Sequence, residues 1–141
     1  MPLSYYPRPG EILICDYSTG FVAPEMTKKR PVVIVSPRLR KRTDLVAVVP
    51  LSTTDPIPQE AHHCAIHLPN PLPPPFDNPD MWAKCDMISV VSLARLDRFK
   101  LTRAGGGPRR WVSGKLSVAD LKAIRAAVLC GLGLPSLTVH L

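Results

Sequence analysis

Several features that would mark a membrane, secreted or metal-binding protein are missing from this chain of 141 residues. No apolar run approaches the ~20 residues of a membrane helix, so we expect no membrane anchor. The first residues have neither a charged n-region nor an apolar h-region, which argues against a secretory signal. The four cysteines form no C-x-x-C pair, and most lie in apolar runs, so we expect buried thiols rather than zinc ligands or disulfides. These absences favour a reducing cytoplasm.

Acidic residues are also scarce. The chain has 11 Asp and Glu against 18 Lys and Arg, a net charge of +7 and a pI of about 9.6. Such a balance favours an anionic partner, either nucleic acid or an acidic protein segment. The alternative is a soluble surface that is basic without binding nucleic acid. The length predicts a single domain over residues 1–141 that buries a core without disulfides.

Helical periodicity is confined to the C-terminal region. Ser117 is a good N-cap, Gly131 a suitable C′ residue, and Val118, Ile124 and Val128 share one apolar face. Before this helix, β-branched and apolar segments predict strands at residues 11–17, 31–36, 45–51, 62–68, 81–92 and 95–102. We therefore predict a mainly β fold. It is a small antiparallel sheet of about five to seven strands, closed or nearly closed as a barrel, with a C-terminal helix.

Proline is abundant, and it is densest between residues 55 and 80. Such a stretch cannot lie inside a helix or a central strand, so we predict a stiff surface loop, partly polyproline II. A docking segment for an SH3-like partner is the less favoured alternative. The glycine run within residues 103–108 lacks the lysine and the strand–loop–helix context of a P-loop, so it predicts a flexible break.

Groups suited to phosphate chemistry gather at the ends of two expected strands. Glu25 precedes Arg30 by five residues, and Arg30 opens the strand at 31–36; Ser52, Thr53 and Thr54 follow the strand at 45–51. A carboxylate, a guanidinium and a hydroxyl cluster form a set that can handle a phosphodiester. Taken singly, each motif is more typical of a surface charge or a polar turn. Their combined spacing in a basic chain favours a functional role.

These residues are similar in order and spacing to the MazF/PemK family of toxin ribonucleases from type II toxin–antitoxin systems. The matching stretches are residues 9–12, 29–37 and 48–54, with weaker matches at 85–91 and 95–96, and the resemblance spans about residues 8–133. It implies an SH3-like barrel of the CcdB/MazF type that works as a homodimer. It also implies sequence-selective, metal-independent cleavage of single-stranded RNA without a cofactor. The implied protein partner is an antitoxin with an acidic, disordered tail.

The resemblance assigns catalysis to Arg30, Ser52 and Glu25. Arg30 would stabilise the charge on the phosphate while the RNA 2′-OH attacks it, and Ser52 would donate a hydrogen bond to a phosphate oxygen. Glu25 would act as a base or orient Arg30. Basic and hydroxyl residues nearby are expected to contact RNA: Lys28, Lys29, Thr53, Thr54, Arg38 and Arg40.

Three histidines, His62, His63 and His67, lie close together with Cys64 and suggest a metal site. In a strand, His63 and His67 point to the same side but lie ~13 Å apart, at ~3.3 Å per residue. One zinc ion cannot bridge that distance. We therefore expect exposed structural histidines and no metal ligands.

Two other functions remain open. A barrel resembling CcdB would poison DNA gyrase without catalysis, and a plain SH3-like module would bind RNA or protein without cleaving it. The set of Glu25, Arg30 and Ser52 favours the ribonuclease. Ile88, which stands where the family often has a basic residue, and the long proline-rich segment 55–80 keep the binding module open.

Overall fold

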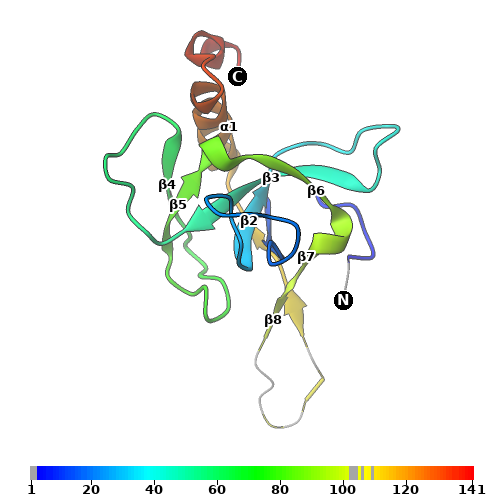
Figure 1. Cartoon of the computed structure of the whole chain (residues 1–141). Coiled ribbons are helices and arrows are strands. Elements are labelled where there is room, and N and C mark those ends of the chain that lie inside the picture. The colour runs from blue at the N-terminus through cyan, green and yellow to red at the C-terminus, as the bar shows by residue number, and fades with distance from the viewer. Residues whose placement is uncertain (1–2, 102–104, 106, 109) are drawn as a thin grey trace.

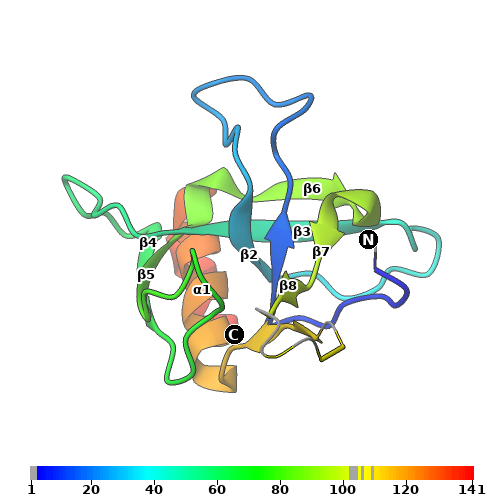
Figure 2. The ribbon, with the colours of Figure 1, turned by 90° about the horizontal axis from the view of Figure 1, so that it is seen from below.

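The main feature of the computed structural model is an antiparallel sheet with one long helix, α1 (Val118–Gly131), packed beside it (Figures 1 and 2). The structure describes residues 3–101, 105, 107–108 and 110–141. Three 3-10 helices are η1 (Cys85–Met87), η2 (Leu93–Arg95) and η3 (Pro135–His140). The strands are β1 (Glu11–Cys15), β2 (Arg30–Ile34), β3 (Leu45–Ser52), β4 (His63–His67), β5 (Asp80–Lys84), β6 (Ser89–Ser92), β7 (Leu96–Asp97), β8 (Phe99–Lys100), β9 (Trp111–Val112) and β10 (Gly114–Lys115).

The six strands of four residues or more all overlap segments that the sequence predicts as β, and β2, β3 and β5 each extend one residue beyond the predicted bounds. The mainly β, antiparallel fold class is therefore confirmed. The short strand expected near residues 62–68 is β4, inside the proline-rich segment. The two-residue strands β9 and β10 were not predicted. The flexible break expected at 103–108 falls largely outside the described residues. Among the described residues, no helix has both the length and the apolar character needed to cross a bilayer.

The sheet does not close into the expected barrel. Its strand order is β10-β1-β2-β3-β5-β4, with β6 also paired to β3 and β7 to β1, and no ladder between described residues joins β10 to β4. β3 changes partner along one edge: Leu45 to Val48 pair with β6, whereas Leu51 and Ser52 pair with β5. β1 changes partner too, since its first residues pair with β10 and its last residues pair with β7. Among the described residues the sheet therefore branches at β1 and at β3, and no ladder joins its outer strands β4, β6, β7 and β10 to close a barrel.

Apolar clusters lie on both faces of the strands, because successive residues alternate between them. Ile12, Val33 and Val49 belong to the cluster that α1 covers. Leu13, Val32 and Val48 belong to the opposite cluster. Burial on both faces explains why these strands read as nearly continuous apolar runs in the sequence.

The start of α1 agrees with the prediction, because Ser117 Oγ accepts a hydrogen bond from Asp120 N at 3.1 Å. Ile124 and Val128 are buried as expected. Val118 is not part of the buried face: it is 88% exposed in the first turn.

The prediction that Gly131 is the C′ residue of α1 is wrong. Gly131 is the last helical residue, and Gly133 adopts the left-handed conformation after it, with φ of 76°. Leu134 N donates to Leu129 O at 2.8 Å and Gly133 N donates to Cys130 O at 3.1 Å. These two bonds form a Schellman motif, which satisfies the terminal carbonyls and ends the helix two residues later than expected.

Candidate active site at the β2–β3–β5 edge

Arg30 and Ser52 lie at the same end of two neighbouring antiparallel strands. Arg30 is the first residue of β2, and Ser52 is the last residue of β3. Val32 lies opposite Pro50 in this ladder. Continuing that register by two residues sets Ser52 across from Arg30, with both side chains on one face of the sheet. This register therefore puts two of the three expected catalytic residues on one face at the same end of the sheet.

Ser52 combines burial with an available proton. Among the described residues it is the one polar residue in the buried class, at 7% exposed. Its Oγ accepts a hydrogen bond from Thr54 N at 3.1 Å. Since that bond uses a lone pair of the oxygen, the hydroxyl proton can still be donated to another acceptor.

Arg30 carries a donor that the surrounding residues leave unused. Its Nε is buried and has no hydrogen-bond partner among the described residues. Leaving such a donor unsatisfied costs about 1–3 kcal/mol, and more for a charged group. A bound anion would satisfy it, because the planar guanidinium fork matches phosphate oxygens.

Glu25 is occupied within its own loop. Its Oε2 accepts a hydrogen bond from Val22 N at 2.7 Å, and its backbone N donates to Val22 O at 2.9 Å. The side chain is exposed. In this conformation the carboxylate holds the turn that precedes β2, which differs from the expected contact with Arg30.

Two side chains of β5 complete the face around Ser52. Trp82 is the cross-strand partner of Ser52, and its Nε1 donates to Asp55 Oδ1 at 2.9 Å. Lys84 Nζ donates to Thr54 O at 3.1 Å. These bonds hold the segment after β3 against β5. The role of Lys84 was not predicted, although alternation with the buried Met81 and Ala83 places Trp82 and Lys84 on one face.

The other expected RNA contacts divide into two groups. Lys28, Lys29, Thr53 and Thr54 are exposed next to Arg30 or Ser52. Arg38 and Arg40 follow the opposite end of β2, and its four residue steps span ~13 Å. The guanidinium of Arg38 instead lies 5.9 Å from the ring centroid of Tyr6. The fold therefore does not bring these two arginines to the Arg30–Ser52 pair.

A cavity of about 490 Å³ that the sequence did not reveal adjoins Lys29. Its lining includes Arg98, Lys100 and Trp111, with Lys100 Nζ 5.1 Å and Arg98 Cζ 6.0 Å from the Trp111 ring centroid. Cations beside an aromatic ring form a surface on which single-stranded nucleic acid can bind and stack. Distant segments of the chain contribute these residues, which is why no local motif predicts the cavity.

Asp16, which also lines this cavity, has a lowered pKa because the hydroxyl and backbone N–H of Ser18 donate to its carboxylate. The acid therefore stays ionised near neutral pH. It is one of two carboxylates in the lining, with Asp97, beside four cations; Arg95, one of these cations, donates to the carbonyls of Asp16 and Thr19 at 3.0 and 2.8 Å.

Comparisons with known proteins bear on the family and the fold of this chain. A family model described as a PemK-like, MazF-like toxin of type II toxin-antitoxin system matches residues 8–129. The uncharacterized protein YifN of Escherichia coli K12 is 33% identical over 122 residues, covering 73% of this chain and 80% of that protein. An uncharacterized protein of Haemophilus influenzae is 32% identical over 136 residues, covering 87% of this chain and 93% of that protein.

Solved structures share the fold at lower identity. An endoribonuclease from a mycobacterial species has a TM-score of 0.60 and 23% identity, covering 93% of this chain and 95% of that one. The Mycobacterium tuberculosis toxin MazF-mt6 has a TM-score of 0.58 and 22% identity, covering 90% and 98%. MazF from Deinococcus radiodurans has a TM-score of 0.66 and 14% identity, covering 92% and 99%. The prediction of a MazF-like fold is therefore confirmed.

Proposed function

The chain belongs to the PemK-like, MazF-like toxins of type II toxin–antitoxin systems, and from this premise we propose that it is an endoribonuclease. In this proposal it cleaves single-stranded RNA at selected sequences without a metal ion. The observation that carries the proposal is the Arg30–Ser52 pair, in which a buried, unpartnered guanidinium N–H faces the same side of the sheet as a buried hydroxyl. Such a pair of donors suits a phosphate group.

The proposed reaction uses the nucleophile of the RNA itself. The 2′-oxygen attacks the adjacent phosphorus and loses its proton, while the bond to the 5′-oxygen breaks and that oxygen gains a proton. The products are a 2′,3′-cyclic phosphate and a 5′-OH. Arg30 and Ser52 stabilise the negative charge that grows on the phosphate oxygens, an effect for which one donor is commonly worth ~10²–10³ in rate. Arg30 is not assigned the role of general base, because a guanidinium holds its protons too tightly to accept another group's proton.

The RNA strand is proposed to follow the basic surface on either side of this pair. Lys28, Thr53 and Thr54 flank it, and Lys29 connects it to the cavity lined by Lys100 and Trp111. Stacking of a base on Trp111 and contacts from the cations would favour some sequences over others. Arg38 and Arg40, at the other end of β2, would steer RNA at longer range through the net charge of +7.

The proposed protein partners follow from the family. We infer that the chain acts in the cytoplasm as a homodimer and that an antitoxin with an acidic, disordered tail inhibits it by covering the basic RNA surface. The net charge of +7 supports attraction to such a tail. Light scattering of the purified chain tests the dimer directly.

The proposal is tested with purified protein and a set of long single-stranded RNAs in EDTA. Arg30→Ala and Ser52→Ala are each expected to lower the cleavage rate by ~10²-fold or more. Lys122→Ala is the matched control, because Lys122 is an exposed cation on α1, which covers the other apolar cluster. Absence of cleavage by the wild type across all RNAs would reject the ribonuclease and favour a gyrase poison or a binding module.

A further inference from the structure

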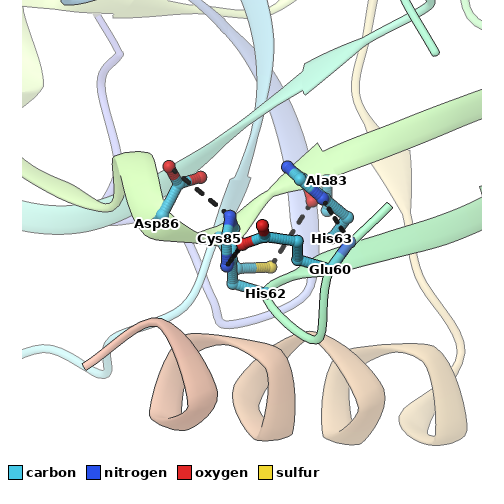
Figure 3. A network of polar contacts seen from close by, with 6 residues as sticks. All are labelled: Glu60, His62, His63, Ala83, Cys85 and Asp86. Carbon is cyan, nitrogen blue, oxygen red and sulfur yellow. Dashed lines mark hydrogen bonds and ion pairs between the residues drawn. The ribbon is translucent and has the colours of Figure 1, made fainter. Parts of the chain in front are cut away.

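Three side chains that can ligate a metal ion converge away from the Arg30–Ser52 pair. His63 is the first residue of β4, His62 directly precedes that strand, and Asp86 comes from η1. Each offers one ligand atom, and these atoms all lie within 4.8 Å of one another. Figure 3 shows His62 between the carboxylates of Glu60 and Asp86, beside the helix α1.

The distances around His62 are too long for hydrogen bonds. Its Nε2 lies 3.8 Å from Asp86 Oδ2, and its Nδ1 lies 3.6 Å from Glu60 Oε2. In a tetrahedral site with metal–ligand bonds of ~2.1 Å, neighbouring ligand atoms lie about 3.4 Å apart. The gap between Nε2 and Oδ2 is therefore wide for a direct bond and close to the spacing of two atoms that share an ion.

We propose that His62, His63 and Asp86 bind one divalent transition-metal ion with the ligand preference of Zn²⁺. Two imidazoles and one carboxylate are the donor types that zinc takes most readily after thiolate. Glu60 stands at the other ring nitrogen of His62, as a carboxylate does behind many metal-bound histidines. When the site contracts around an ion, a hydrogen bond from His62 Nδ1–H to Glu60 would fix the tautomer that directs the Nε2 lone pair toward the ion. Water takes the fourth position.

Binding requires one local rearrangement. His63 Nδ1 accepts a hydrogen bond from Glu60 N at 2.9 Å, so the ion must replace that N–H as the partner of the nitrogen. The side chains of Glu60 and Asp86 are 57% and 46% exposed, which leaves them room to move toward the ion. The site can therefore contract without disturbing the buried core.

The position of this metal site indicates a structural role. That role is separate from RNA cleavage, and the proposal does not depend on the proposed ribonuclease activity. A Cβ on Gly131 would lie 3.3 Å from both the Asp86 Cα and the His62 Cβ, so the last turn of α1 packs directly against the ligands. Cys85 N donates to His62 O at 3.1 Å. An ion here would fasten the start of β4, η1 and the end of α1 to one another.

The test uses the full chain without an affinity tag, stripped of metal with EDTA and dialysed. Zn²⁺ binding is measured by calorimetry, and Co²⁺ binding is measured by its visible absorption, which reports tetrahedral coordination. We expect one ion per chain, and at least tenfold weaker binding for Asp86→Asn and His63→Gln. His67→Gln is the matched control, because His67 pairs with Asp80 at 2.7 Å and is not a ligand.

Both variants must keep the near-UV circular dichroism and the metal-free melting temperature of the wild type. Asp86→Asn is the more informative change, because it is isosteric at an exposed position. Loss of affinity in the folded variant, with His67→Gln unaffected, supports the site. Failure of the wild type to bind either ion, or wild-type affinity in both variants, would overturn it.

Discussion

Val32 of β2 lies opposite Pro50 of β3, and this register sets Arg30 across from Ser52. Both residues therefore start from positions on two central strands rather than on flexible loops. Sites on strands hold their geometry more precisely than sites on loops. The proposed reaction needs that precision, because a small displacement of either group relative to the phosphate weakens both donors.

Replacing Arg30 with lysine tests whether the positive charge alone or the planar shape of the guanidinium supports cleavage. Arg30→Lys keeps the positive charge but loses the planar fork and the buried Nε–H. We expect cleavage to fall by ~10²-fold. The melting temperature should stay the same or rise, because an unpartnered buried donor is removed. Cleavage rates and thermal melts on the same samples check this, and near wild-type cleavage would show that charge alone suffices.

The hydroxyl of Ser52 is tested by two substitutions. Ser52→Ala removes the donor and the acceptor of Thr54 N, so we expect a rate loss of ~10²-fold and a stability loss of about 1 kcal/mol. Ser52→Thr keeps the hydroxyl and should retain most of the activity. Single-turnover rates and urea denaturation separate the two effects. An equal loss of cleavage rate in Ser52→Ala and Ser52→Thr would indicate that packing around residue 52, rather than its hydroxyl, supports the reaction.

Glu25 is expected to serve its loop more than the reaction. Glu25→Gln keeps an acceptor for Val22 N but removes the negative charge. We therefore expect cleavage within a few-fold of the wild type over pH 6–9. If the cleavage rate instead falls by ~10²-fold and one side of the pH–rate profile disappears, Glu25 is the general base that the family resemblance implies.

Two cysteines are expected to be inert near neutral pH. Burial raises the pKa of both Cys15 and Cys85 to about 12, above the ordinary value for a thiol. At pH 8 each therefore remains a protonated, unreactive thiol, and the reactive thiolate would appear only as the pH approaches 12. Iodoacetamide at pH 8 followed by peptide mass spectrometry should leave both unmodified until the protein is denatured. Rapid alkylation of either in the native state would contradict the burial shown here.

The strands and the start of the helix were predictable because their signals are local. β-branched runs give β2 and β3, and the Ser117 cap gives the first turn of α1. The end of α1 was mispredicted because two glycines, Gly131 and Gly133, compete for one role. The open, branched sheet was unpredictable for another reason: the changes of partner along β1 and β3 depend on tertiary pairing.

The distinction between local signals and tertiary pairing also explains which parts of the sites were predictable. Arg30 and Ser52 end adjacent strands, so their meeting follows from strand order and register. The histidine cluster was missed because the distance argument used His63 and His67 within one strand. His62 precedes that strand, and Asp86, its neighbour in space, lies in η1. The cavity beside Trp111 likewise joins residues that no local pattern connects.

The most direct test of the central claim is to map the ends of RNA that the wild-type protein produces in EDTA. The account predicts discrete cuts whose 5′ ends are hydroxyls, so a kinase labels them without prior phosphatase treatment, and no cutting of DNA of the same sequence. An intact RNA, or cuts that require added metal and carry 5′-phosphates, would contradict cleavage by the 2′-OH at the Arg30–Ser52 pair.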